Sequence, residues 1–233
     1  MKHILIPILV LMVVSSYALA SPQENNEVGD RVVRSAITLK EILNTPDKSV
    51  PQDLLDRCAC VVVIPGMVKG AFVFGANYGK GVISCRTENG AGPWSAPSMV
   101  LMSGGSFGFQ IGAQATDLVL VIMNLSGMDS LLDSKFTLGG DASVAAGPVG
   151  RNVAAKTDVL MGAKILAYSR SKGVFAGLSL NGEVVRADQD AIFVLYKKRL
   201  TPREILFHPM AGIPKDAQIF VDELAKASPK QRK

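Results

Sequence analysis

The stretch from residue 101 to residue 124 constrains the fold of this chain most. Between Phe107 and Ala113, larger side chains alternate strictly with Gly108, Gln110 and Gly112. An alternation with a period of two residues is typical of a β-strand, and glycine along one face indicates that another layer of backbone lies close to it. Nothing in the stretch is arranged for bond-making chemistry. The stretch therefore predicts a strand within a sheet, and it favours a binding surface over a catalytic site.

The first twenty residues have the pattern of a bacterial secretory signal peptide. Lys2 and His3 precede an apolar run from Ile4 to Val14, and Ala18-Leu19-Ala20 is a cleavage site of the small-x-small type. The run is too short to span a bilayer as a helix, although an uncleaved anchor is the alternative. We expect cleavage between Ala20 and Ser21, followed by export to the periplasm or the medium and peripheral association with a membrane.

Charge and length restrict the classes of function. Removing 20 of the 233 residues leaves 213, which suits one domain with a sizeable core. The mature chain keeps 24 of the 25 basic residues and all 20 acidic residues, so its net charge is +4. This mild excess permits contact with anionic lipid and is too weak to predict a nucleic-acid partner.

The three cysteines predict one disulfide and one free thiol, as an odd number requires in an exported chain. Cys60 opens one strand-like run and Cys85 ends another, so a Cys60–Cys85 bridge forms if the two strands are neighbours. Cys58 is then left over. The alternative is a metal or redox site at Cys58 and Cys60, but no second pair of Cys or His is present to complete the coordination.

Periodicity predicts helices at both ends and strands between them. From Val28 to Leu43 the apolar residues fall on one helical stripe, whereas residues 21–27 are polar and predict no regular structure. Further helices are expected after Pro51 and over 188–199, 201–207 and 215–227. Strands are expected at Val61–Ile64, Ala71–Phe74, Val82–Cys85, Ser98–Met102, Leu118–Met123, Ile165–Arg170 and Val174–Leu180, with a hairpin loop at Gly75–Gly81. The fold class is α+β, with a strongly curved, barrel-like, mainly antiparallel sheet and flanking terminal helices.

The residues do not predict a catalytic or metal site. His208 is the single histidine of the mature chain, and nucleophile, phosphate-loop and zinc-protease motifs are absent. We therefore expect no enzyme activity, no catalytic residue, no cofactor and no bound metal. Asp117 precedes a buried strand and needs a partner, for which Lys135 and Arg151 are candidates.

Basic residues recur on the first helix and at turns. The helix carries Arg31, Arg34 and Lys40 off its apolar stripe. Such a helix can lie in a membrane interface, or its stripe can pack on the protein's own sheet. The turns add four more cations: Lys69, Lys80, Arg170 and Lys172.

Seven ordered stretches together resemble the SYLF domain, also called the Ysc-type actin-binding domain. They begin at Val63, Gly79, Trp94, Gly104, Lys135, Ala146 and Tyr168, and include Val63-Ile-Pro-Gly-Met-Val-Lys-Gly-Ala-Phe-Val-Phe-Gly75 and Tyr168-Ser-Arg-Ser-Lys-Gly-Val-Phe-Ala-Gly177. The resemblance covers residues 28–196, which leaves 197–233 as a helical extension with a basic tail.

The resemblance implies binding of phosphoinositides and other anionic phospholipids without catalysis, through a basic amphipathic N-terminal segment. Its positions here are Arg31, Arg34 and Lys40, to which we add Lys69, Arg170 and Lys172 as expected lipid-binding residues. Eukaryotic members also bind actin, which we do not expect an exported protein to meet. The competing interpretation is a structural or protein-interaction module of the cell envelope.

Overall fold

The computed structural model describes residues 22–45, 50–71, 74–107, 112–124, 135–148, 162–171, 174–175, 180–208 and 212–229. The helices are α1 (Pro22–Leu43), α2 (Gln52–Arg57), α5 (Gln189–Tyr196), α6 (Pro202–Phe207) and α7 (Gln218–Ala227), with short 3-10 turns η1 (Glu88–Gly90) and η3 (Lys215–Ala217). The strands are β1 (Cys60–Ala71), β2 (Phe74–Cys85), β3 (Ser98–Phe107), β4 (Gly112–Ile122), β5 (Lys135–Thr137), β6 (Val144–Ala146), β7 (Ile165–Ser171), β8 (Val174–Phe175) and β9 (Val184–Ala187).

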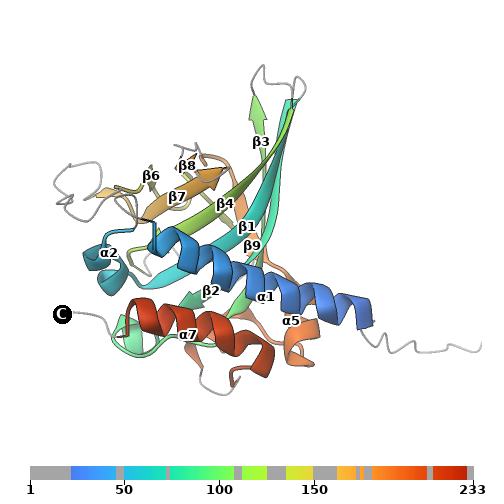
Figure 1. Cartoon of the computed structure of the whole chain (residues 1–233), viewed down its shortest axis with the longest axis vertical. Coiled ribbons are helices and arrows are strands. Elements are labelled where there is room, and N and C mark those ends of the chain that lie inside the picture. Colours follow the sequence, from blue (N-terminus) through green and yellow to red (C-terminus); the bar gives the residue numbers. More distant parts are fainter. Residues whose placement is uncertain are drawn as a thin grey trace, which may run out of the picture.

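Nine strands of the described part form one strongly curled sheet. Their order is β5-β9-β3-β2-β1-β4-β7-β6, and β8 pairs with β7. The β6–β7 pair is parallel, and the other pairs are antiparallel. Figure 1 shows the long strands β1 to β4 rising past α1 and α7, which lie side by side. The predicted α+β class with a curved, mainly antiparallel sheet is confirmed.

Two hydrophobic cores lie on opposite faces of the sheet. The helix-face core joins Val61 and Val63 of β1 to the buried stripe of α1 and to Phe220 of α7. The inner-face core joins Val62 and Ile64 to residues from nearly every other strand. Because strand side chains dominate this second core, the sheet has to curl around it. The continuous apolar run Val61–Ile64 forms part of a strand, as predicted, and is buried because both of its faces are covered.

A bulge in β1 produces the sharp curvature. Between Ile64 and Met67, β1 has one residue more than either neighbour, and Gly66 adopts a φ of 59°. The predicted loop Gly75–Gly81 is wrong, because these residues belong to β2. Their glycines permit close approach to the bulge: a Cβ on Gly81 would lie 2.0 Å from the carbonyl oxygen of Val63. The glycine cluster reflects backbone contact and not a turn.

The first helix is longer than its stripe predicts. Val28, Val32 and Ala36 are buried in the helix-face core, so of the two alternatives for the stripe the structure shows packing on the protein's own sheet. The helix begins at Pro22, before the stripe. Residues distant in the sequence stabilise the additional turns: Lys80 donates a hydrogen bond to Glu27, and Lys197 donates one to Asn25. The prediction that this segment has no regular structure is therefore wrong for residues 22–27. Their polar composition gives no sign of these long-range contacts.

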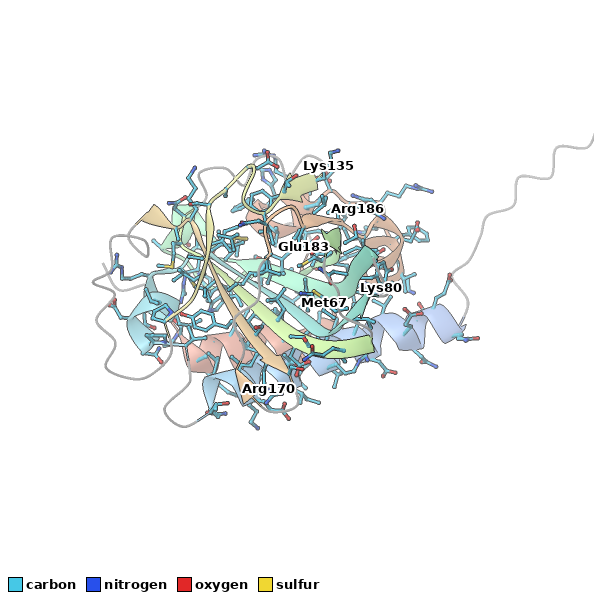
Figure 2. All side chains as sticks on the ribbon, turned by 90° about the horizontal axis from the view of Figure 1, so that it is seen from above. Met67, Lys80, Lys135, Arg170, Glu183 and Arg186 are labelled. Atoms are coloured by element: carbon cyan, nitrogen blue, oxygen red, sulfur yellow. A yellow bond between two sulfur atoms is a disulfide. The ribbon has the colours of Figure 1, made fainter. Side chains whose placement is uncertain are left out.

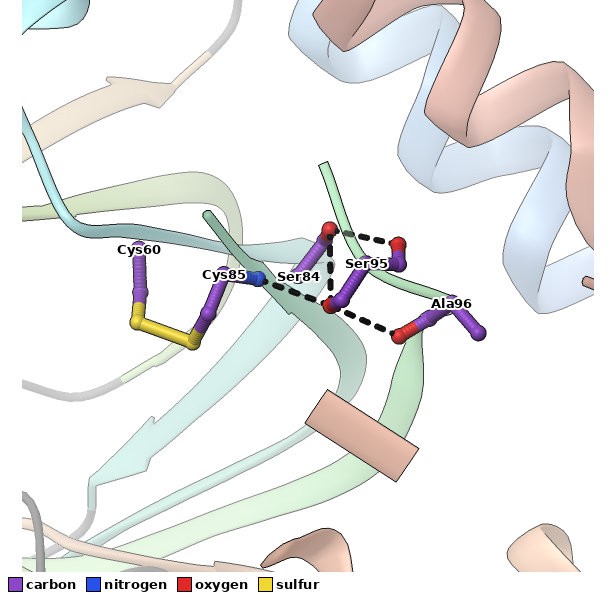
Figure 3. The surroundings of a disulfide bond; sticks show 5 residues. All are labelled: Cys60, Ser84, Cys85, Ser95 and Ala96. Atoms are coloured by element: carbon purple, nitrogen blue, oxygen red, sulfur yellow. Dashed lines mark hydrogen bonds between the residues drawn. A yellow bond between two sulfur atoms is a disulfide. The ribbon is translucent and has the colours of Figure 1, made fainter. Parts of the chain in front are cut away.

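The structure pairs Cys60 with Cys85 (Figure 3). The two residues are register partners on β1 and β2, and their Sγ atoms are 2.06 Å apart. Next to them, the Cys85 backbone N–H donates to Ser95 Oγ at 3.1 Å, which ties β2 to the segment before β3. Cys58 is the free cysteine and is buried, so the alternative site at Cys58 and Cys60 is not formed.

Candidate functional site

Two ion-pair clusters hold α1 on the helix face of the sheet, and Glu27 joins Arg31 and Lys80 in the first of them. Arg31 Nη1 donates to Asp188 Oδ2 at 2.7 Å, and Lys80 Nζ donates to Glu27 Oε1 at 3.0 Å. The bond from Lys80 is the first cause of a lowered pKa at Glu27. At the other end of the helix, Arg170 bonds Glu41. The helix is therefore fastened to the rest of the protein near both of its ends.

Arg170, which is labelled in Figure 2, joins α1 to the sheet. It donates to Glu41 of α1 and, at 3.0 Å, to Asp117 Oδ2 of the neighbouring strand. The bond to Glu41 is the first cause that raises the pKa of Arg170. Asp117 Oδ1 in turn accepts from the Gly66 backbone N–H at 2.9 Å, so the same group supports the β1 bulge. Asp117 has a partner, as expected, but it is Arg170 and not Lys135.

The structure describes five of the six predicted lipid-binding residues, and two of these five are already paired with carboxylates. Arg31, expected off the apolar stripe, is only 3% exposed and is occupied by Asp188, so we exclude it from any contact surface. Arg170 is likewise paired, with Glu41 and Asp117. Lys69 projects from the inner face of β1, half-buried and in register with Asn77. Lys172 lies outside the described residues, as do Arg151 and residues 108–111 of the alternating stretch.

The outward face of α1 keeps the remaining two cations together with exposed apolar side chains. Arg34 and Lys40 are exposed, and within the described part of the chain neither forms an ion pair. Between and beside them, Val33 is 38% exposed and Ile37 is 48% exposed. The spacing 33, 34, 37, 40 follows the helical period, so these four side chains share one face. We call this set the α1 outer face.

A second group of cations was missed by the sequence analysis. Lys197, Lys198 and Arg199 follow α5 and are all exposed. Lys197 adopts a left-handed φ of 56° as the C-cap of α5 and bonds Asn25 near the start of α1. The signal was three consecutive basic residues at the end of the helix predicted over 188–199, which the structure ends at Tyr196. Only the folded chain brings this run to the N-terminal end of α1.

A groove of about 710 Å³ opens where the ends of α1 and α7 meet the start of α2. Leu43, Val50 and Leu55 supply apolar walls, while Lys40 and Lys226 contribute cations. Lys226 Nζ donates to Glu223 Oε1 at 2.8 Å, so its charge is partly compensated. Lys40 thus belongs both to the α1 outer face and to the lining of this groove.

The C-terminus of α7 is fastened by a buried polar cluster. Arg86 Nη2 donates to the Ser228 carbonyl oxygen at 2.9 Å, and the Arg86 guanidinium stacks 4.3 Å from the ring centre of Trp94. Ser228 Oγ donates to Asp56 Oδ1 at 2.7 Å, which connects α2. Burial lowers the pKa of Arg86. Every bond here serves to join elements, and the cluster is closed to solvent.

Among the described residues, no group of three His, Cys, Asp or Glu side chains is placed to hold a metal ion. His208 ends α6 as its C-cap and is exposed. Burial raises the pKa of the Cys58 thiol to about 12, which keeps it protonated and unreactive. The expected lack of enzyme activity stays a prediction. Within the described ranges, the longest apolar helical stretch falls short of what a bilayer crossing requires.

Comparison with known proteins identifies the relatives of this fold. A family model described as "Las17-binding protein actin regulator" matches residues 103–227. The chain belongs to the Ysc84, or SYLF, family. This match runs through α5, α6 and α7, so these helices lie within the region that the Ysc84 model describes. The expected domain boundaries stay a prediction.

Individual Ysc84 relatives come from fungi and mammals. LAS seventeen-binding protein 3 of Saccharomyces cerevisiae is 36% identical over 163 residues, or 69% of this chain and 35% of its own length. Protein YSC84 of the same yeast is 33% identical over 179 residues, 76% of this chain and 37% of its own. Human SH3 domain-containing YSC84-like protein 1 is 30% identical over 176 residues, 75% and 50% respectively. The chain thus spans about a third to a half of the relatives it matches.

Proposed function

We propose that this Ysc84-family protein binds anionic phospholipid at a membrane surface, without covalent chemistry. The observation that carries the proposal is the α1 outer face, where Val33 and Ile37 are exposed beside Arg34 and Lys40. Apolar residues flanked by cations on one helix are the pattern of an interfacial helix. Because the buried stripe of α1 is already packed on the sheet, this outer face is the part of the helix left to meet lipid.

The electrostatic attraction is modest and therefore sensitive to salt. Arg34 and Lys40 each contribute about 1 kcal/mol beside an anionic surface. Asp30 lies on the same helix and opposes them, while Glu27 and Glu41 are paired with sheet cations. Lys197, Lys198 and Arg199 add positive charge at the N-terminal end of α1. Attraction by these cations orients the helix, and partial insertion of the two apolar side chains then retains it.

We further propose that the protein acts outside the cytoplasm of a bacterium, after removal of residues 1–20. The sequence pattern of that segment supports the proposal. An exported protein meets phosphatidylglycerol-type lipids before it meets phosphoinositides, so the shared chemistry is the headgroup phosphate.

The test is flotation of residues 21–233 with vesicles of phosphatidylcholine containing phosphatidylglycerol. We expect binding at low ionic strength that weakens as salt is added, and that the double variant Arg34→Glu/Lys40→Glu largely abolishes. The matched control Lys135→Glu/Arg186→Glu changes the charge equally, on strands β5 and β9 at the far edge of the sheet. Equal binding by wild type and the α1 variant would show that the assigned surface is wrong.

A protein partner is the second candidate, and the names of the relatives favour it. LAS seventeen-binding protein 3 is named for a protein that it binds, and the matching family model is described as an actin regulator. Under this hypothesis the chain docks on a protein of the cell envelope or, in a cytoplasmic setting, on actin or a Las17-like partner. Co-sedimentation with actin filaments, without any vesicle binding, would favour this candidate over the lipid proposal.

A further inference from the structure

Two buried polar side chains meet across β3 on the inner face of the sheet. Asn77 of β2 is 3% exposed, and Glu183, which immediately precedes β9, is 2% exposed. Asn77 is in register with Gly104, while Val184 is in register with Ser103, so Glu183 lies beside Gly104 on its other side. Figure 2 labels Glu183 together with Met67 of the same inner face.

Gly104 makes the contact between these two side chains possible. A Cβ at this position would lie 2.2 Å from Glu183 Oε2 and 2.4 Å from Glu183 Cδ. Any other residue would therefore occupy the space that the carboxyl group fills. Strands β2 and β9 are not neighbours in the sheet, and the Asn77–Glu183 contact joins them over the glycine between them.

The hydrogen bonds of the pair are incomplete in a specific way. Asn77 Nδ2 donates to Glu183 Oε1. The other two atoms of the pair, Asn77 Oδ1 and Glu183 Oε2, are buried and have no hydrogen-bond partner. Both are oxygens, and an ionised carboxylate can only accept hydrogen bonds. Burying two acceptors without a donor is costly in free energy. One hydrogen atom between the two oxygens would remove this cost.

We propose that Glu183 is protonated in the native protein and forms a cyclic acid–amide pair with Asn77. The Oε2–H group donates to Asn77 Oδ1, while Oε1 accepts from Asn77 Nδ2. A single proton, taken from solvent, thus gives a partner to both of the atoms that lack one. The pair is a pH-dependent tie between β2 and β9 that helps to hold the curl of the sheet.

The groups that face Glu183 are consistent with the protonated form. Strand β1 presents Lys69, which is in register with Asn77, and β3 presents Gly104 without a side chain. Leu138, just after β5, contributes a backbone N–H that donates to the Glu183 carbonyl oxygen at 2.8 Å. Burial raises the pKa of Glu183, and the opposing effects of the Asn77 hydrogen bond and the Lys69 charge are smaller.

Loss of the proton breaks the tie. A carboxylate oxygen would then face the amide oxygen of Asn77 with no hydrogen between them. Because the native state holds the proton more tightly than the unfolded chain, the stabilisation is complete below the ordinary pKa of 4.5 and is lost as pH rises through the native pKa. Each unit by which the native pKa exceeds 4.5 lowers the Tm by about 3 to 5 °C at higher pH.

The variant Glu183→Gln tests the pair, because glutamine has the shape of the protonated acid and its amide can donate to Asn77 Oδ1. We expect the Tm of wild type to fall, relative to that of E183Q, as pH is raised from 4.5 to 8. The matched control Glu88→Gln alters an exposed carboxyl group and should reproduce the wild-type profile. A Tm of E183Q below that of wild type at every pH would overturn the proposal, because it would mean that the native fold needs the charged carboxylate.

Infrared spectroscopy supplies a second measurement that does not require a folded variant. In wild type labelled with ¹³C at the glutamate carboxyl groups, the protonated-carboxyl C=O band should titrate in two steps, with one carboxyl group keeping its proton after the exposed glutamates have ionised. A band that disappears in a single step centred near pH 4.5 would overturn the proposal. Stabilisation of wild type, but not of E183Q, by added Ca²⁺ would also overturn it, by assigning the two oxygens to a bound cation.

Discussion

Arg31 of α1 and Asp188, the N-cap of α5, form a hydrogen-bonded ion pair at 2.7 Å across 157 residues of sequence. The same carboxylate accepts from the Ala191 backbone N–H at 3.3 Å, so it caps α5 while it holds α1. Arg31 thereby links the first helix to the helix that follows the last strand. A cation on an amphipathic helix can thus serve the fold and be withdrawn from any partner.

Replacing Arg31 with methionine should destabilise the protein. The substitution keeps much of the apolar stem but leaves Asp188 unpaired and only partly exposed, and removal of one partner of a buried pair costs about 3 to 5 kcal/mol. Urea denaturation followed by Trp94 fluorescence measures the change in unfolding free energy. The control Arg34→Met, three residues along the helix and exposed, should alter stability by about 0.5 kcal/mol or less. Equal stability of the two variants would contradict the structural role of Arg31.

Removing the exposed apolar side chains of α1 should weaken vesicle binding without unfolding the protein. Val33→Ser/Ile37→Ser removes two apolar side chains. Full burial of each in lipid would contribute about 2 kcal/mol and partial insertion only part of that, so we expect the affinity for vesicles to fall about tenfold. The control Val68→Ser/Tyr78→Ser removes a similarly exposed cross-strand pair on β1 and β2. If the control weakens binding as much as the α1 variant, insertion does not occur through α1.

Alanine should destabilise the protein at position 81 but not at position 105, although both are glycines of neighbouring strands. A Cβ on Gly81 would lie 2.0 Å from a backbone oxygen, whereas the nearest atom to a Cβ on Gly105 is 3.8 Å away. Overpacking of this kind costs about 1 to 3 kcal/mol, and backbone cannot move aside as a side chain can. Thermal unfolding should show a lower Tm for Gly81→Ala and an almost unchanged Tm for Gly105→Ala. A stable Gly81→Ala protein would mean that β1 and β2 are not in close contact there.

Cys58 should be inert in the folded protein. Burial raises its pKa to about 12, so the thiolate that reacts with alkylating agents is nearly absent at pH 8. Treatment with iodoacetamide without reductant should label no cysteine in the native state and Cys58 alone in denaturant, as mass spectrometry of tryptic peptides will show. Since the native state favours the protonated thiol, stability should fall as pH rises from 9 towards 12. Rapid labelling of the native protein would contradict this burial.

Features encoded within a few residues of one another were predictable. The capping box of Thr201 and Glu204 forms as its spacing indicates, with the Glu204 backbone N–H donating to Thr201 Oγ1 at 3.2 Å. The stripe of α1 from Val28 to Leu39 is buried because a helix turns at a constant angle. The strand-like positions of Cys60 and Cys85 also suggested that they could be paired. The capping box and the stripe each depend on spacing within a single helix, whereas the cysteine pairing also required the two strands to be neighbours.

The two glycine-rich stretches show where this reasoning reaches its limit. Gly79 and Gly81 resemble a turn when β2 is considered alone, because glycine is common in turns. Their reason becomes visible only when the β1 bulge is placed above them. Gly104 likewise carries no local signal that a carboxyl group from residue 183 will lie on it. Register between strands distant in the chain decides both.

The sequence by itself determined the class of fold, the positions of most helices and strands, the family, and the set of cations from which a contact surface could be built. Only the tertiary structure decided which of those cations are free. Arg31, Lys80 and Arg170 are each paired with a carboxylate from another part of the chain. Within the described residues, Arg34 and Lys40 form no ion pair. The physical reason is that periodicity is set by neighbours in sequence, while the state of a charge is set by whichever groups the folded chain brings within a few ångströms of it.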